Sequence, residues 1–174
     1  LFDGAEGKTD FASTAQIAKI LDSPIILAID ASKAARSIAA TAYGFINFDK
    51  KLNIKGIIVN KIASKKHLNL IKDAFDNNIK IPIVGVIYKN QELTFSERHL
   101  GLIPTVELDN KRKKKVLNSA RTIADYLDYD ELISIIKPLK NEQALKKKDK
   151  PNNKPKNIKI AVALDNSFNF YYQE

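Results

Sequence analysis

The sequence predicts a doubly wound α/β fold with a mostly parallel sheet, and two observations carry this prediction. Three apolar runs of strand length, rich in Ile and Val, occupy residues 24–30, 54–60 and 81–87. They lack alternating polar residues, which is typical of strands buried on both faces. Segments with helical periodicity lie between these runs, and alternating strands and helices imply right-handed crossovers around a parallel sheet.

Each of the first three predicted helices has a candidate capping residue. Ser13 or Thr14 can cap the helix before the first strand, Ser32 the helix after it, and Ser64 the helix after the second strand. Hydroxyl side chains at these positions can accept a hydrogen bond from the free backbone N–H groups of a helix start. The pattern therefore predicts three helices that begin at these residues.

The last third of the chain has a different pattern. An apolar stripe over residues 116–127 and the segment 130–137 predict two helices that pack at the sheet's edge. Residues 140–157 are rich in Lys, Asn and Pro and cannot bury enough apolar surface to fold, so we expect a linker. Residues 158–165 form another strand-like apolar run, which we expect to begin a second domain.

Composition bounds the class of protein. The 174 residues are 44% hydrophobic and 28% charged, as in ordinary globular proteins. The absence of cysteine excludes disulfides, thiolate zinc sites and a cysteine nucleophile within this sequence. No apolar run approaches the roughly 20 residues that span a membrane, and no signal-peptide pattern is visible, so we expect a cytoplasmic protein with no membrane partner. Because methionine is absent, we expect the chain to begin within a longer one.

The net charge of +9 suggests nucleic-acid binding at first sight, but its distribution argues against that function. Residues 111–115 and residues 140–157 each contribute +5, which leaves about −1 for the rest of the chain. Blocks of like charge are more often solvated segments than binding faces. We therefore expect no nucleic-acid partner.

Polar residues at the strand ends are the first candidates for a site, because ligands of open parallel sheets bind beyond the carboxyl ends of the strands. Asn60 and Lys61 end the second strand, and an amide there can hydrogen-bond an adenine edge; alternatively, Asn60 only begins a turn. Asp30 ends the first strand and can hold a metal-bound water or cap the next helix.

Basic and ionisable residues near the crevice are the second candidates. Lys33 and Arg36 follow the first strand and can bind carboxylates or phosphate, or remain solvated. Glu97, Arg98 and His99 are consecutive before a Leu-Gly-Leu turn; they can form a site or an ion pair with the histidine packed beneath.

Several expected motifs are missing. His67 lies beside two lysines and is expected to be exposed, and the two histidines are not spaced as metal ligands, so we expect no zinc site. Neither a G-x-x-x-x-G-K-[ST] phosphate loop nor a glycine-rich dinucleotide motif is present. With six glycines, the chain is not expected to cradle a triphosphate unaided.

Seven segments in this order resemble one family, the cobyrinate a,c-diamide synthases. The resemblance spans nearly the whole chain apart from the lysine-rich linker, and ERHLGL followed by IAVALD-x-x-FNFYY is its most specific part. The matching segments are LFDG, STAQIAKIL, PIILAIDASKAARSIAA, GF-x-x-FD, GIIVNKI, ERHLGL and KIAVALDNSFNFYYQE.

This resemblance implies a P-loop NTPase-like topology, similar to dethiobiotin synthetase and the Min/Par-type ATPases. It assigns residues 1–139 to part of an ATP-binding amidoligase domain, 140–157 to a linker and 158–174 to the start of a triad-type glutaminase domain. The family's phosphate loop and a second acidic residue would precede residue 1, and the glutaminase cysteine and histidine would follow residue 174. We therefore expect the chain as given to be inactive.

The resemblance also implies roles for individual residues. Asp3 matches the acidic position of the family's active-site loop, near the phosphates, Mg²⁺ and the carboxylate to be activated. Asn60 and Lys61 match the adenine-side motif. Two further sets match motifs that are expected to line the substrate crevice, namely Asp30, Lys33, Arg36 and Ser37, and Glu97, Arg98 and His99.

The implied reaction uses ATP, Mg²⁺ and glutamine to amidate the a and c carboxylates of cobyrinate in cobalamin biosynthesis. ATP activates the carboxylate as an acyl phosphate, which ammonia from glutamine attacks. Two alternatives stay open: the same reaction on nickel-sirohydrochlorin, and a Min/Par-like ATPase that acts as a binding module. The FNFYY segment argues against the second, because a plain ATPase needs no further α/β domain. The oligomeric state stays open too, with a homodimer as one option.

Overall fold

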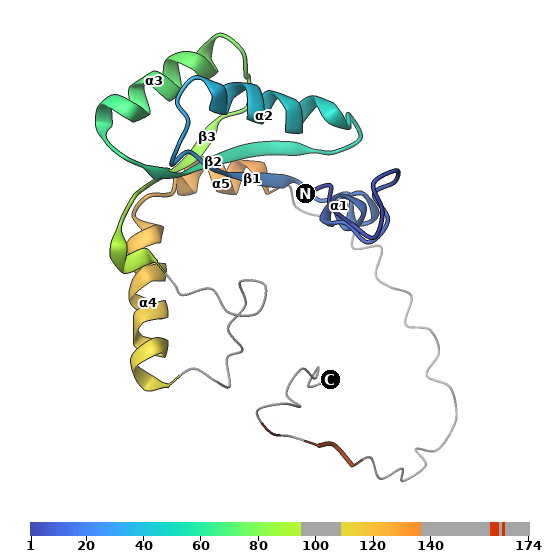
Figure 1. The fold of residues 1–174 in the computed structure, drawn as a ribbon, viewed down its shortest axis with the longest axis vertical. Helices are drawn as coiled ribbons and strands as arrows, with labels where there is room; N and C mark the ends of the chain where they lie inside the picture. The colour runs from blue at the N-terminus through green and yellow to red at the C-terminus, as the bar shows by residue number, and fades with distance from the viewer. Residues whose placement is uncertain (95–108, 137–160, 164, 166–174) are drawn as a thin grey trace. The chain divides into compact units, whose positions relative to one another are not determined.

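The computed structural model of the chain describes residues 1–94, 109–136, 161–163 and 165. These residues belong to two compact units, Leu1–Thr94 with Asn118–Lys137, and Phe95–Leu117 with Pro138–Glu174. Figure 1 labels the elements in chain order: α1 (Thr14–Leu21), β1 (Ile25–Asp30), α2 (Ser37–Phe48), β2 (Ile54–Ile62), α3 (Lys65–Asp76), β3 (Ile83–Tyr88), the 3₁₀-helix η1 (Gln91–Leu93), α4 (Asn110–Ala124) and α5 (Tyr129–Ile135).

The three predicted strands form one parallel sheet, which confirms the predicted α/β class. The strand order is β1-β2-β3, so each strand pairs with its neighbour along the chain. Asp30 at the end of β1 is in register with Asn60 of β2. Because all strands run in the same direction, their carboxyl ends share one edge of the sheet.

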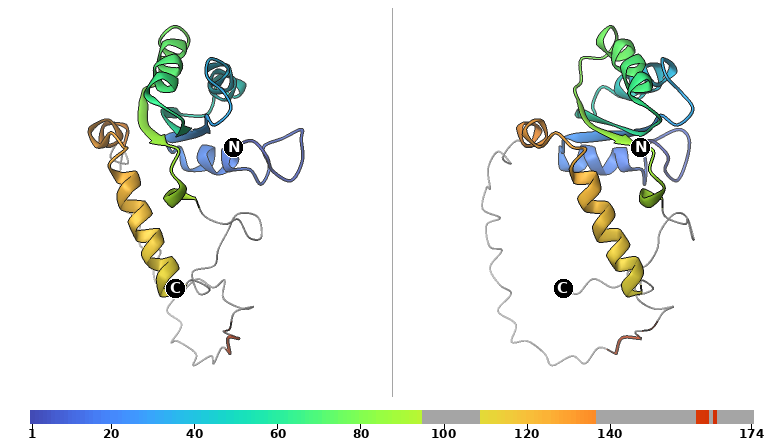
Figure 2. Two further views of the ribbon diagram at one scale, coloured as in Figure 1. Left: turned by 60° about the vertical axis from the view of Figure 1, so that its left-hand side comes forward. Right: turned by 90° about the vertical axis from the view of Figure 1, so that its left-hand side faces the viewer.

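Helices cover both faces of this sheet, as a doubly wound fold requires. Helices α2 and α3 contact each other and lie on one face, while α1 lies on the other (Figures 1 and 2). Two right-handed crossovers that step in the same direction bring their helices to the same face, which explains the pairing of α2 with α3. Helix α5 contacts β2 and β3.

Two of the three predicted helix caps are confirmed and one is wrong. The side chains of Ser13 and Ser64 accept hydrogen bonds from Gln16 N–H and His67 N–H at the starts of α1 and α3. Helix α2, however, begins at Ser37 and not after Ser32. The reason is local: the backbone N–H of Ser32 donates to the Asp30 carboxylate, 2.8 Å away, and this turn uses the residues that would have formed the first helical turn.

The core lies at the centre of the sheet. Ile57, Val59 and Ile62 of β2 are fully buried, as are Val84 of β3 and Ile71 of α3. Each such side chain stabilises the fold by about 1.5–3 kcal/mol on transfer from water. The central strand β2 is therefore held most firmly, and this fixes the position of the residues at its end.

The two edges of the sheet differ. At the outer edge of β3, Val86 N–H donates to Tyr126 O at 3.1 Å and Asp128 N–H donates to Val84 O at 2.9 Å, which forms an antiparallel bridge of Gly85 with Leu127. At the outer edge of β1, no strand pairs within the described residues. Segment 126–128 thus closes one edge, close to where the sequence predicted helices to pack.

Helix α4 confirms the helix predicted over its region, but its buried residue differs from the expected stripe. Within the first unit the buried side chain is Ser119, whose hydroxyl donates to Glu92 O at 3.3 Å, whereas Ala120 is exposed. The amphipathic pattern therefore identified the helix without identifying the contact that it makes. In the second unit the basic residues 111–115 are exposed, as their charge requires.

The strand predicted over residues 158–165 is not seen in its described part. Residues 161–163 are exposed and belong to no strand, and the other described residue is Asp165. A strand is held by hydrogen bonds to a neighbouring strand, and no described strand pairs with residues 161–163. The predicted linker, residues 140–157, lies outside the described residues. In the described part, no helix is both long and apolar enough to cross a bilayer.

Candidate functional site

Three of the predicted site residues meet at the carboxyl end of the sheet. Lys61 Nζ donates to Asp30 Oδ2 at 2.6 Å, and Asn60 is the register partner of Asp30. The backbone carbonyl of Asn60 accepts from Ala31 N–H at 2.8 Å, which ties the two strand ends together. We call Asp30, Asn60 and Lys61 the strand-end cluster.

A β-bulge sets the direction of Lys61. Val59 pairs with Val86 and Ile62 pairs with Tyr88, so β2 has one residue more than β3 between these pairs. Lys61 takes up this extra length with a positive φ of 61°, the left-handed conformation that glycine usually supplies in such bulges. The Asn60 side-chain oxygen accepts the Lys61 backbone N–H at 2.8 Å and holds this conformation.

Asp30 is ionised over the whole physiological range. The hydrogen bond from Lys61 and then those from Ser32 lower the pKa of the Asp30 carboxyl from 3.8 to about 2. Both side chains of the ion pair are about half exposed, with relative exposures of 53% for Lys61 and 49% for Asp30. The pair is therefore open to solvent and to a ligand.

His67 holds the loop that follows β1, contrary to its predicted exposure. Its Nδ1 accepts the backbone N–H of Ala63 at 3.1 Å, so Nε2 carries the proton and donates to Ala34 O at 2.8 Å. The ring is half-buried. His67 thereby joins the loop after β2 to the loop after β1, which carries Lys33 and Arg36.

Asp3 lies in a separate place, on a loop formed by residues 1–13. It is exposed, and the described residues give its carboxylate neither a hydrogen bond nor an ion pair. It lines a cavity of 820 Å³ together with Lys8, Lys19, Asp49 and other residues of the loop. None of the other predicted site residues that the structure describes lines this cavity.

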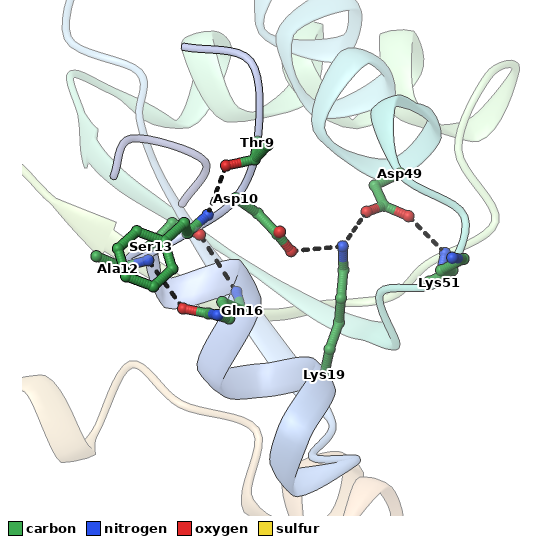
Figure 3. A network of polar contacts seen from close by, with 9 residues as sticks. Thr9, Asp10, Ala12, Ser13, Gln16, Lys19, Asp49 and Lys51 are labelled. Carbon is green, nitrogen blue, oxygen red and sulfur yellow. Dashed lines mark hydrogen bonds and ion pairs between the residues drawn. The ribbon is translucent and has the colours of Figure 1, made fainter. Parts of the chain in front are cut away.

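An ion network that the sequence did not predict borders the same cavity (Figure 3). The Lys19 amine on α1 forms ion pairs with Asp10 of the loop, at 2.7 Å, and with Asp49 at the end of α2. Hydrogen bonds from Lys19 lower the pKa of both carboxyls, and the two carboxylates raise the pKa of Lys19. The only earlier signal was Asp49 in the GF-x-x-FD segment.

Among the described residues, the remaining predicted site residues do not join either group. Arg36 and Ser37 line a cavity of 510 Å³ with Tyr43 and Asn78, between α2 and the end of α3. Lys33 is exposed in the turn before α2. Glu97, Arg98 and His99 lie outside the described residues.

One protein-family model matches residues 4–97, and its description is "AAA domain". The match covers more than half of the chain and includes residues 4–13 of the loop, Asp49 and the strand-end cluster, whereas Asp3 lies just before it. No solved structure was found to match the chain.

Curated relatives match the chain over its whole length. A cobyrinate a,c-diamide synthase of Synechococcus sp. is 42% identical over 176 residues, which cover 100% of this chain and 38% of that protein. The synthase of Methanococcus vannielii is 43% identical over 185 residues, 100% of this chain and 40% of its own length. That of Listeria innocua is 38% identical, again over 100% and 38%. The chain thus spans about two fifths of the length of the relatives that it matches.

Proposed function

Because the chain belongs to the AAA domain family and is similar over its whole length to cobyrinate a,c-diamide synthases, we propose that it is part of such a synthase. The proposed reaction is the amidation of the a and c side-chain carboxylates of cobyrinate, in cobalamin biosynthesis, with ATP and with glutamine as the nitrogen donor. The observation that carries this proposal is the identity of 35–43% to curated cobyrinate a,c-diamide synthases over the whole length of the chain. Residues 1–139 would form part of the amidoligase domain, and residues 158–174 would begin the glutaminase domain.

We assign the adenine side of an ATP site to the strand-end cluster. Asn60 is half-buried, and its side-chain oxygen already accepts the Lys61 N–H, which leaves its NH₂ group to donate to a base. The aliphatic part of Lys61 can pack along the base, while its amine stays at Asp30. The residues present therefore fit a nucleotide base.

We assign the phosphate side to the loop that carries Asp3. An exposed carboxylate without a partner among the described residues fits Mg²⁺, which prefers one or two carboxylates together with water and phosphate oxygens. In the described part of the chain, no group of three or more acidic, histidine or cysteine side chains could hold a metal ion. When bound, ATP with Mg²⁺ would supply the phosphoryl group that activates a carboxylate.

Basic residues in the loop after β1 suit a substrate that bears many carboxylates. Lys33 and Arg36 are exposed and can reorient toward a bound anion. Asp30 and Ser37 would line the same side, and Glu97, Arg98 and His99 would add a second set of polar contacts. Substrate binding by these residues is part of the proposal.

The test is to incubate the product of the complete reading frame with ATP, Mg²⁺, glutamine and cobyrinate, and to follow amide formation by mass spectrometry. Two successive acid-to-amide conversions that require both ATP and glutamine are expected. Amidation of nickel-sirohydrochlorin but not of cobyrinate would mean that nickel-sirohydrochlorin is the substrate. ATP hydrolysis without amidation of either ring would favour a Min/Par-like ATPase instead.

The same preparation tests the adenine assignment. Asn60→Ala is expected to raise the Kd for ATP about fivefold, because the loss of a hydrogen bond from a half-buried amide costs about 1 kcal/mol. Asn47→Ala is the matched control, since the Asn47 amide bonds within α2, to Tyr43 O at 2.9 Å. An unchanged Kd in Asn60→Ala, measured by calorimetry, would remove Asn60 from the nucleotide site.

A further inference from the structure

The loop that carries Asp3 is fastened at two points. On one side of Asp3, the Phe2 ring packs against Phe45 and Phe48 of α2, with ring centroids 5.9 and 4.7 Å apart. On the other side, the hydrogen bond from Ala5 N–H to Phe11 O, at 3.0 Å, closes the loop on itself. The position of the Asp3 carboxylate therefore depends on the end of α2 and on the part of the loop around Phe11.

The second fastening is tight. A β-carbon at Gly4 would lie 2.2 Å from Phe11 O and 3.1 Å from Ser13 N, so the backbone on both sides of the loop is in direct contact there. The Ser13 N–H donates to Asp10 O at 3.0 Å, and Ser13 itself is buried and caps α1. A displacement of Asp10 would therefore shift Phe11 and Gly4, and with them Asp3.

Lys19 connects these two fastenings. Its amine forms ion pairs with Asp10, which directly precedes Phe11, and with Asp49, which follows the last residue of α2 (Figure 3). The three side chains retain relative exposures of 25% for Lys19, 35% for Asp10 and 26% for Asp49, so the network is mostly shielded from water. Without the amine, two carboxylates would face each other without a counter-charge, and their repulsion would separate the loop from α2.

We propose that Lys19 is a positioning residue, which fixes the loop of Asp3 against α2 through Asp10 and Asp49. Its role in catalysis rests on the proposed amidoligase function, but its role in holding the loop does not. Lys19 touches no substrate in this scheme; it acts through the backbone contacts that link Asp10 to Asp3. The cavity that these residues line is the place where the placement of Asp3 matters.

Hydrogen exchange measures the loop directly. In Lys19→Gln, the amides of Ala5 and Ser13 are expected to exchange at least about tenfold faster than in the wild type, because their acceptors belong to the loop that has been released. Amides of β2 should keep their protection. Lys19→Arg should restore the slow exchange, because a guanidinium can bind both carboxylates.

Kinetics of the complete reading frame provide the functional measurement. Lys19→Gln is expected to lower kcat for amidation about tenfold to hundredfold and to leave KM for ATP within about twofold, because a misplaced carboxylate affects the reaction more than base binding. Lys50→Gln is the matched control: Lys50 is next to Asp49, is exposed, and forms no ion pair among the described residues.

The outcomes separate the two proposals. Unchanged exchange of Ala5 and Ser13 in Lys19→Gln would overturn the positioning role, as would an equal effect of Lys50→Gln. If the wild type amidates no tetrapyrrole, the proposed function fails, and the exchange measurement alone decides whether Lys19 holds the loop. If Lys19→Gln does not fold, Asp49→Asn, which weakens only the attachment to α2, should still accelerate exchange of the loop; wild-type exchange in that variant would refute the proposal.

Discussion

At the scale of single residues, the sequence predicted the members of the strand-end cluster but not their contacts. Asp30, Asn60 and Lys61 could be found because each ends an apolar run, and the ends of parallel strands meet. The ion pair of Lys61 with Asp30 could not be predicted, since it depends on one extra residue in β2 and on the backbone turn that this residue causes. Bulges leave no clear pattern in apolar periodicity.

The ion pair gives a prediction about acid. Because folding lowers the Asp30 pKa from 3.8 to about 2, this carboxylate stabilises the folded state above about pH 4, and the contribution is lost as pH falls toward 2. In Lys61→Gln the Asp30 pKa should rise toward 3.8, since Lys61 is the largest cause of the shift, and it should stay below 3.8 because the hydrogen bonds from Ser32 remain. NMR titration of the carboxyl carbon measures it. The effect on the free energy of unfolding should stay near 0.5 kcal/mol, because the pair is half exposed; an unchanged pKa in the variant would refute the pairing.

The Lys19 network was missed for a related reason. Lys19, Asp10 and Asp49 come from a helix, a loop and the end of another helix, and nothing in their spacing links them. The prediction that His67 is exposed was wrong because its partners are backbone groups of two loops. The contact of His67 with Ala34, which is far away in the sequence, leaves no local sequence pattern of the kind that a helix cap leaves.

At the scale of elements, strands were predicted more accurately than the starts of helices. The strands agree with the apolar runs within two residues, because burial on both faces leaves little choice of residue type. Helix starts depend on competition for one or two hydrogen bonds. Ser13 and Ser64 accept the backbone N–H groups at the starts of α1 and α3, so helices begin there. At Ser32, by contrast, the backbone N–H donates to the Asp30 carboxylate, and no helix begins.

The helix caps give a prediction at this scale. Ser64→Ala should lower the free energy of unfolding by about 1 kcal/mol, because the His67 N–H at the start of α3 loses its acceptor. Ser32→Ala is the matched control and should change stability by less than about 0.5 kcal/mol, since Ser32 caps no helix, its backbone bond to Asp30 remains, and the side-chain hydrogen bond that is lost goes to a half-exposed carboxylate. Urea unfolding of the two variants compares them; equal losses would mean that Ser32 has a structural role that the hydrogen bonds do not explain.

At the scale of the whole molecule, the alternation of apolar runs and helical segments predicted the α/β class. It did not predict the order of the strands in the sheet. Nothing in the periodicity indicated that segment 126–128 would close the outer edge of β3 while that of β1 stays open among the described residues. The reason is that edge pairing here is made by backbone groups of residues far apart in the sequence, which apolar periodicity does not connect.

The open edge of β1 can be tested with proline. The N–H of Ala31 donates to Asn60 O, so in the alternation along the strand the N–H of Ala28 points to the opposite, open edge. Proline removes that N–H group. In the purified chain, Ala31→Pro should therefore destabilise the fold by about 1–3 kcal/mol more than Ala28→Pro, because only Ala31→Pro leaves the carbonyl of Asn60, a half-buried residue, without its donor. Denaturant unfolding measures the difference, and equal losses would mean that β1 is paired on both sides.

The left-handed backbone of Lys61 has a consequence for how the chain can change in evolution. A side chain at a φ of 61° costs about 1 kcal/mol or more, which a glycine at the same position would not incur. A glycine, however, would remove the amine that reaches Asp30. Position 61 therefore cannot satisfy both requirements: glycine would favour the stability of the fold, and lysine supplies a charged group at the ends of the strands. The chain has the lysine.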